Sequence, residues 1–137
     1  MIKNGNSLSL KAEELLELKN LFNKQSYALL EEKTKLLIKK YPNVPMLFNI
    51  LGISQSSTKK FNEAIDNFKK TIELDPKLID AHNNLGIALK NKGDFTKSLD
   101  VFKNALKINS NHYLSNFNLG DLYTKFNEIE KATNCFK

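Results

Sequence analysis

Arginine and tryptophan are both absent from this chain of 137 residues, and cysteine occurs once. All 21 basic side chains are therefore lysines, so the planar guanidinium group that binds phosphates and base edges through paired hydrogen bonds is missing. The net charge of +6 is spread along the chain rather than gathered in one basic segment. We therefore expect most lysines to cover solvated helix faces, and we expect no specific nucleic-acid partner.

A single cysteine, Cys135, allows no internal disulfide and excludes the disulfide frameworks of small secreted domains. We interpret its thiol as a small apolar filler in the last helix. The N-terminal residues contain no apolar stretch of signal-peptide length. No segment approaches the ~18 consecutive apolar residues of a membrane-spanning helix. These observations predict a cytoplasmic protein without a membrane span.

Glycine is also scarce, with five residues, yet three of them follow a fixed interval. Gly52, Gly86 and Gly120 are 34 residues apart, and each comes directly after a leucine. Other side chains recur at the same interval: Phe61, Phe95 and Ile129; Ala64, Ser98 and Ala132; and Phe68, Phe102 and Phe136. Self-similarity at one period is typical of repeat architectures.

Each period is predicted to contain two amphipathic helices joined by a tight turn. Apolar residues recur at steps of three and four in the second helix, as in Phe95, Leu99 and Phe102. The turns contain Gly93 and Asn127, two residue types that tolerate the left-handed conformation. Lys59 and Lys60 stand there in an earlier copy, so that turn is less well specified. We expect the repeated glycines to permit close helix packing, and Asp75 to act as the N-cap of the following helix.

This pattern resembles the tetratricopeptide repeat. The shared features are the 34-residue period, the Leu-Gly pair, a small residue and a later aromatic residue in the second helix, and Pro42 and Pro76 near unit boundaries. The resemblance covers residues 45–137 strongly and 11–44 weakly, where Leu18 and Thr34 replace the glycine and phenylalanine. It implies an all-α fold, a right-handed α-solenoid of helix-turn-helix repeats.

The resemblance also predicts the domain organisation. We expect an N-terminal tail at residues 1–10, a degenerate repeat at 11–44, repeats at 45–78 and 79–112, and a last repeat at 113–137 with an incomplete second helix. The sequence ends one residue after Phe136, and no polar capping helix follows. We therefore expect a truncated array.

No catalytic, metal-binding or cofactor-binding site is expected. His82 and His112 are 30 residues apart, without cysteines or clustered carboxylates at ligand spacing. Glu13 and Glu14 are adjacent, so their side chains diverge around a helix. The isolated glycines form no phosphate-binding loop. The chain is therefore not predicted to be an enzyme by itself.

The resemblance implies that the first helix of each repeat lines a concave groove that holds a partner. Asn84 and Asn118 occupy equivalent positions, and side-chain amides can bond the backbone of an extended strand. The alternative is that asparagine is simply abundant in this chain. The predicted groove residues are Asn49, Ile53, Asn83, Asn84, Ile87, Lys90, Phe117, Asn118 and Asp121.

Two functions follow from this interpretation. The first is a scaffold that binds a peptide or partner domain in the groove. The second is the N-terminal recognition arm of a larger enzyme, a glycosyltransferase or sulfotransferase, with its catalytic domain downstream of this chain. The end of the sequence in mid-helix supports considering the second, and the asparagines before the Leu-Gly pairs resemble those in the repeat arms of O-linked N-acetylglucosamine transferases.

Overall fold

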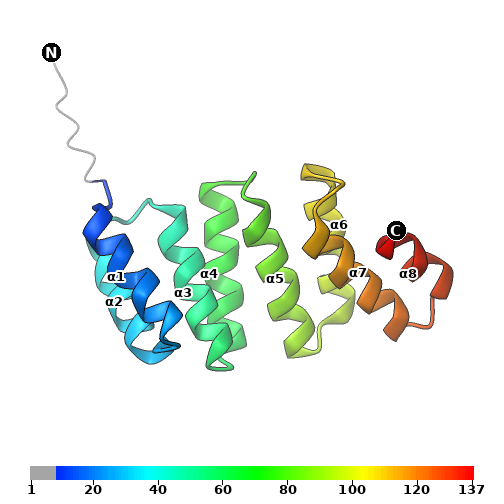
Figure 1. Cartoon of the computed structure of the whole chain (residues 1–137), viewed down its shortest axis with the longest axis horizontal. Helices are drawn as coiled ribbons and strands as arrows, with labels where there is room; N and C mark the ends of the chain where they lie inside the picture. The colour runs from blue at the N-terminus through cyan, green and yellow to red at the C-terminus, as the bar shows by residue number, and fades with distance from the viewer. Residues whose placement is uncertain (1–8) are drawn as a thin grey trace, which may run out of the picture.

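The computed structural model describes residues 9–137, and all regular structure in that range is helical. The expected tail at 1–10 lies mostly outside the described residues. The helices follow one another along the long axis of the molecule (Figure 1). Their bounds are α1 (Ala12–Asn23), α2 (Tyr27–Lys40), α3 (Pro45–Ser57), α4 (Phe61–Leu74), α5 (Ile79–Lys92), α6 (Phe95–Ile108), α7 (Tyr113–Lys125) and α8 (Ile129–Phe136).

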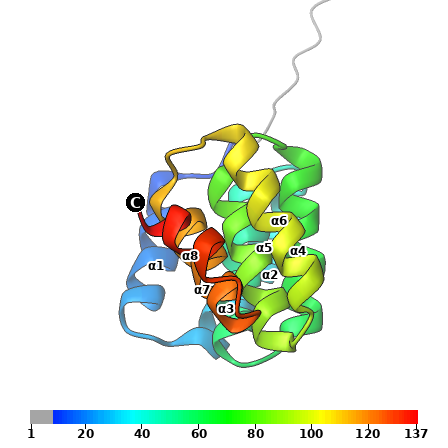
Figure 2. The ribbon, with the colours of Figure 1, turned by 90° about the vertical axis from the view of Figure 1, so that its right-hand side faces the viewer.

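The helices form four consecutive hairpins, each made of a first helix (α1, α3, α5 or α7) and a second helix (α2, α4, α6 or α8). Each helix packs against its neighbours in the sequence, and α5 also contacts α3 and α7. Seen along the array, α4 and α6 lie toward one side and α1 and α7 toward the other (Figure 2). This arrangement is an all-α solenoid, which confirms the predicted fold class.

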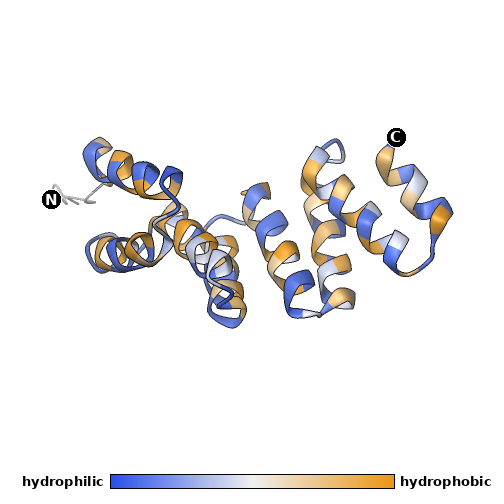
Figure 3. Ribbon diagram, turned by 60° about the horizontal axis from the view of Figure 1, so that its bottom comes forward, coloured by the Kyte–Doolittle hydropathy of each residue, from blue (hydrophilic) through white to orange (hydrophobic). Residues whose placement is uncertain are grey.

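The hairpins fall inside the four ranges expected for the repeats, while the division into those units stays a prediction. Apolar and polar residues are interleaved along the helices, so each helix has apolar residues for packing as well as polar ones (Figure 3). Among residues 9–137, no helix is both long and apolar enough to cross a membrane.

The turn inside each hairpin has the same geometry in all four copies. A residue with positive φ recurs every 34 positions: Gln25 (56°), Lys59 (63°), Gly93 (97°) and Asn127 (59°). In each case the next backbone N–H donates to a carbonyl five residues earlier, as Lys60 does to Gln55 at 2.8 Å. This is the Schellman arrangement, which closes a helix through one left-handed residue. The predictions for Gly93 and Asn127 are confirmed, and Lys59 adopts the same turn without a favourable side chain.

Replacing Lys59 with glycine is expected to stabilise the protein by about 0.5–1 kcal/mol, because a left-handed residue with a Cβ atom is strained. Lys59 is exposed, so the change removes little packing. Urea unfolding of Lys59→Gly measures the gain. Gly93→Ala is the matched control, because a Cβ atom there meets nothing within 4 Å and only backbone strain changes. An unfolding free energy that falls in Lys59→Gly would contradict the strain account.

The repeated glycines lie against the repeated phenylalanines of the same hairpin. A Cβ atom added at Gly52 or Gly86 would be 2.5 Å from a ring carbon of Phe68 or Phe102, respectively. The small residue one turn before the phenylalanine also approaches the first helix, since Ser98 Oγ donates to the Gly86 carbonyl at 2.6 Å. The glycines therefore permit close helix packing, as predicted.

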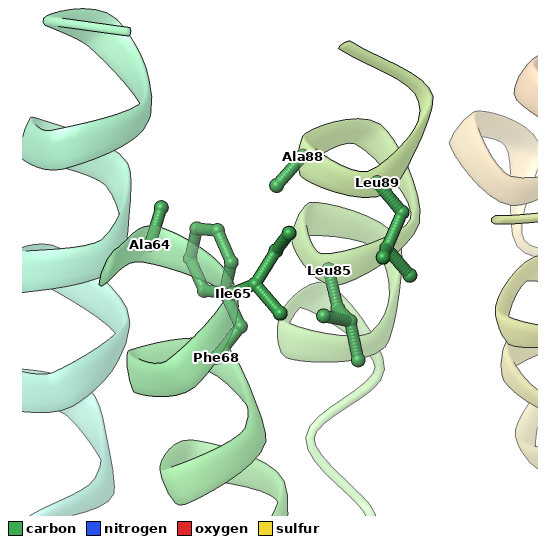
Figure 4. Packing of buried hydrophobic residues seen from close by; sticks show 6 residues of the cluster. All are labelled: Ala64, Ile65, Phe68, Leu85, Ala88 and Leu89. Carbon is green, nitrogen blue, oxygen red and sulfur yellow. The ribbon is translucent and has the colours of Figure 1, made fainter. Parts of the chain in front are cut away.

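The core continues from each hairpin to the next. Ile65 and Phe68 of α4 lie toward Leu85, Ala88 and Leu89 of α5 (Figure 4). A second cluster joins Phe102 of α6 to Leu119 and Leu122 of α7. Since each hairpin buries its apolar faces against the adjacent one, stability depends on the junctions between hairpins as well as on the hairpins themselves.

The first hairpin reverses the sizes of the packed pair. Leu18 is 1% exposed at the position of the glycines, and Thr34 is 0% exposed at the position of the phenylalanines. Thr34 Oγ1 donates to the Leu30 carbonyl at 2.6 Å, which satisfies its hydroxyl group. At these positions the first helix has a large residue and the second a small one, and because both are buried the core stays filled without the repeated motif.

The predicted role of Asp75 is wrong. Helix α4 ends at Leu74, and α5 begins only at Ile79, after Leu78 as its N-cap residue. The Asp75 carboxylate instead accepts the backbone N–H of Lys77 at 3.2 Å within the loop. Asn109, one period later, binds Asn111 in the same way at 3.0 Å. The Asp75 side chain is therefore engaged in a turn of the loop, three residues before the N-cap position of α5.

Candidate functional site

The first helices carry two asparagine pairs that connect one hairpin to the next. Asn84 Nδ2 on α5 donates to Asn49 Oδ1 on α3 at 3.2 Å. Asn118 Nδ2 on α7 donates to Asn83 Oδ1 on α5 at 3.3 Å. We call these contacts the amide bridges. Both join residues 35 positions apart and so connect two neighbouring first helices, while Asn118 Nδ2 also donates to the Leu114 carbonyl of its own helix at 2.8 Å.

The bridging residues differ in what they present to solvent. Asn83 is 3% exposed and Asn118 is 8% exposed, and Ser115 Oγ also donates to Asn83 Oδ1 at 3.4 Å. Asn49 and Asn84 are half-buried. A buried, fully bonded amide fixes the spacing of two helices, whereas a half-buried amide can also meet a partner.

Lys90 extends the polar surface toward α7. Its Nζ donates to Asp121 Oδ2 at 3.0 Å and to Asn118 Oδ1 at 3.3 Å. Ile87 lies one turn earlier and packs against the cluster that contains Phe102 and Leu119. Hydrogen bonds therefore connect Asn83 and Lys90 on α5 to Asn118 and Asp121 on α7.

Phe117 and Ile53 lie toward opposite ends of this surface. Phe117 is about half exposed and stacks with Tyr113 at a centroid distance of 6.2 Å. Phe136 lies 5.9 Å from it, and these three aromatic residues line a cavity that also includes Cys135. Cys135 packs against the apolar cluster as the predicted filler, and burial raises the pKa of its thiol. The thiol is therefore poorly suited to act as a nucleophile.

An apolar pocket of about 310 Å³ lies between α1 and α3. Its lining consists of Leu15, Leu18, Lys19, Phe22, Ile50 and Ile53. Ile53 is the one predicted groove residue among them. The four lining residues on α1 were missed because this helix lacks the Leu-Gly pair by which the groove positions were aligned.

The two histidines lie at the starts of α5 and α7 and make local hydrogen bonds there. His82 Nε2 lies 2.9 Å from the Pro76 carbonyl, and His112 caps α7 by accepting the Ser115 N–H at 3.3 Å. Residues 9–137 contain no group of three or more histidine, cysteine or carboxylate side chains arranged to hold a metal. The surface that remains can form hydrogen bonds, ion pairs and apolar contacts.

The junction between the first two hairpins contains a buried polar network beside its apolar cluster, and the sequence did not reveal this network. Glu31 on α2 is 6% exposed and accepts hydrogen bonds from Lys35 at 2.6 Å, Lys60 at 3.0 Å and Gln55 at 3.5 Å. Burial opposes ionisation of Glu31, but the hydrogen bonds from Lys35, Lys60 and Gln55 outweigh it and lower the pKa. The corresponding positions one period later are Ile65 and Leu89, which belong to one apolar cluster.

A second carboxylate network closes the first hairpin itself. Glu14 on α1 accepts hydrogen bonds from Lys40 Nζ at 2.7 Å, the Lys11 N–H at 3.0 Å and the Tyr41 hydroxyl at 2.7 Å. These bonds lower the pKa of Glu14 to about 2. Both ends of the first hairpin therefore depend on ionised carboxylates.

Comparisons with known proteins agree with this geometry. The family described as TPR repeat matches residues 57–93, and the family described as tetratricopeptide repeat matches residues 79–112. No curated protein matches the sequence. The crystal structure of MamA aligns with a TM-score of 0.83 at 19% identity, over 90% of this chain and 72% of that one. The Sgt2 TPR domain from Aspergillus fumigatus aligns with a TM-score of 0.80 at 15% identity, over 90% and 85%.

At these identities the structural likeness establishes the fold alone. The chain is an α-solenoid of helical hairpins. Residues 57–112 match the tetratricopeptide-repeat family, as the two sequence matches show. A role as the arm of a larger enzyme stays a prediction.

Proposed function

We propose that this chain is a non-catalytic interaction scaffold that binds a peptide or a partner domain on the face of its first helices. The observation that carries the proposal is the pair of amide bridges, which hold α3, α5 and α7 at fixed spacing. A face that is already ordered loses less conformational entropy when a partner binds.

The residues of this face divide into two groups. Asn83 and Asn118 are buried and support the spacing of the helices. Asn49, Asn84, Ile87, Lys90 and Asp121 are half-buried or exposed, and we assign the partner contacts to them together with Phe117 and Ile53. The contacts expected with a partner are therefore of three kinds. The amides can bond the partner's backbone, the Lys90–Asp121 ion pair can open to pair with charges on the partner, and the apolar side chains can pack against it.

Photo-cross-linking to captured proteins tests this assignment. A cross-linking residue at Met46 on α3 or Asp121 on α7 is expected to label a bound partner, because both side chains are exposed on first helices. Lys69 on α4 and Lys103 on α6 are the matched controls, since both are exposed on second helices. Labelling that is equal or stronger from the control positions would contradict the proposal.

Salt dependence provides a second measurement on any captured partner. Because the face combines neutral amides with few charges, its affinity is expected to change much less between low and moderate salt than the roughly thousandfold loss of a partner held by many lysines. A loss of affinity of that size would indicate that the partner binds the lysines of the outer helix faces instead.

A further inference from the structure

The pocket between α1 and α3 occupies the place of a missing amide bridge. The bridges join Asn49 to Asn84 and Asn83 to Asn118, always 35 residues apart. One step earlier, the same interval joins Leu15 to Ile50, and both of these residues line the pocket. The first junction therefore has two apolar side chains where each later junction has two amides.

This substitution explains why the pocket is open. Two asparagines draw neighbouring first helices together through a directed hydrogen bond, whereas leucine and isoleucine form none. Residues of α3 and α5, and likewise of α5 and α7, come close to one another, whereas fewer residues do so between α1 and α3. The space between them is lined by Phe22 and Leu18 from α1 and by Ile53 from α3.

The charges around the pocket favour an acidic partner. Lys19 is the one charged residue in the lining. The carboxylates nearest in sequence are turned toward α2, since Glu14 pairs with Lys40 at 2.7 Å and Glu17 pairs with Lys33 at 3.1 Å. Among residues 9–137, Lys19 has no ion-pair partner, and the chain as a whole carries a charge of +6. A carboxylate on the partner would complement this lysine.

We propose that this pocket binds one bulky apolar side chain, such as leucine or phenylalanine, from a partner peptide in which an acidic residue adjoins it and pairs with Lys19. The proposal rests on the scaffold function above and names the chemistry of its partner. A volume of about 310 Å³ is near the lower end for ligand sites, which suits one or two side chains. The apolar group supplies most of the affinity, and the carboxylate fixes the direction of the peptide.

The probe is a synthetic peptide, Gly-Ser-Asp-Phe-Asp-Ser-Gly with blocked ends, titrated into the isotope-labelled full chain and followed by amide chemical shifts. The largest shifts are expected on α1 and α3. A peptide with alanine in place of phenylalanine should bind roughly tenfold or more weakly, as expected for loss of a buried aromatic side chain. A peptide with asparagine in place of both aspartates should bind a few-fold more weakly, as expected for an exposed ion pair.

Variants of the chain test the same contacts from the other side. Leu15→Asn combined with Ile50→Asn copies the later amide bridges and should weaken binding of the phenylalanine peptide at least tenfold. Leu36→Asn is the control, because Leu36 is an exposed apolar residue on α2. Lys19→Glu should weaken binding a few-fold, and Lys39→Glu, an exposed lysine on α2, should not. The shift map of the unaltered chain remains decisive if the double variant fails to fold.

Three outcomes overturn the proposal: shifts absent from α1 and α3 at millimolar peptide, equal affinity for the phenylalanine and alanine peptides, or pocket signals that shift with protein concentration without peptide. The last would show a second copy as the occupant. The scaffold function can survive this failure, since cross-links from Met46 and Asp121 would still locate a partner on the first helices. Conversely, peptide in the pocket with cross-links confined to second helices would retain this proposal and reject the partner contacts assigned to α5 and α7.

Discussion

Gly86→Leu is expected to lower the free energy of unfolding by about 1–3 kcal/mol, although leucine is the better helix former. A Cβ atom at Gly86 would be 2.5 Å from Cε1 of Phe102. That ring is fully buried, so it cannot move aside without displacing the core around Leu119 and Leu122. Urea unfolding followed by circular dichroism gives the change.

The first hairpin supplies the compensating substitution. Phe102→Thr alone is expected to cost about 3–5 kcal/mol, as for other large-to-small changes in a core. Gly86→Leu together with Phe102→Thr copies the Leu18 and Thr34 pair. The double variant should therefore lose less than the sum of the single losses, by about 0.5–3 kcal/mol. Additive losses would mean that the two positions are not packed against each other.

Gly120→Leu is the matched control for the close contact. A Cβ atom at Gly120 would be 2.6 Å from the ring of Phe136, nearly the same distance as at Gly86. Phe136 is 53% exposed, however, so its ring can turn toward solvent. The loss should be clearly smaller than for Gly86→Leu, and equal losses would contradict the role assigned to burial.

Acidification is expected to release the first hairpin before the rest of the array. The pKa values of Glu14 and Glu31 are lowered in the folded protein, to about 2 for Glu14. Their contribution to stability is therefore complete above the ordinary value of 4.5 and is lost as the pH falls below it, through about 2 for Glu14. Hydrogen exchange of α1 and α2 should accelerate over this range before that of α5 and α6.

Substitutions at Glu31 separate its charge from its position. Glu31→Ala should cost about 1–3 kcal/mol at neutral pH, since Gln55 loses a buried partner while the lysines can reach solvent. Glu31→Ile with Gln55→Leu copies the apolar pair one period later and should be neutral or stabilising by up to about 4 kcal/mol.

The exposed neighbour Glu32→Ala is the control, and a change within about 0.5 kcal/mol is expected for it. The pH dependence of the apolar pair should be flatter than that of the original chain. An unchanged pH profile in Glu31→Ile with Gln55→Leu would show that Glu31 does not contribute to acid sensitivity.

The fold was predictable because it depends on a few residues at a fixed interval. Gly52, Gly86 and Gly120 each contact a phenylalanine 16 positions later. The same helix packing therefore recurs every 34 residues and is visible in the sequence. Lys59 shows the limit of this signal, because its turn is imposed by the hairpin around it rather than by its own preference. The first hairpin was only weakly visible, since Leu18 and Thr34 fill the same space with the sizes reversed.

The site was less predictable, because alignment places residues in equivalent positions and does not show which of them touch. Asn84 and Asn118 are equivalent in sequence, yet each bonds an asparagine 35 positions earlier. A search at that interval would have found both pairs, and would also have placed Leu15 with Ile50. The Glu31 network has no such signal, since a buried carboxylate with lysine partners resembles an ordinary charged helix face until the helices are assembled.

The amide bridges, the glycine contacts and the left-handed turns also govern how this chain can change in length. Each of them joins residues within one period or between adjacent periods, so a duplicated copy of residues 79–112 inserted after His112 would find suitable partners on both sides. Asn83 of the first copy would face Asn84 of the second, as it now faces Asn118. An insertion of one residue inside a helix would instead rotate the following turns by about 100° and expose their buried faces. Duplication of whole periods is thus the route by which such a chain can grow without a new core.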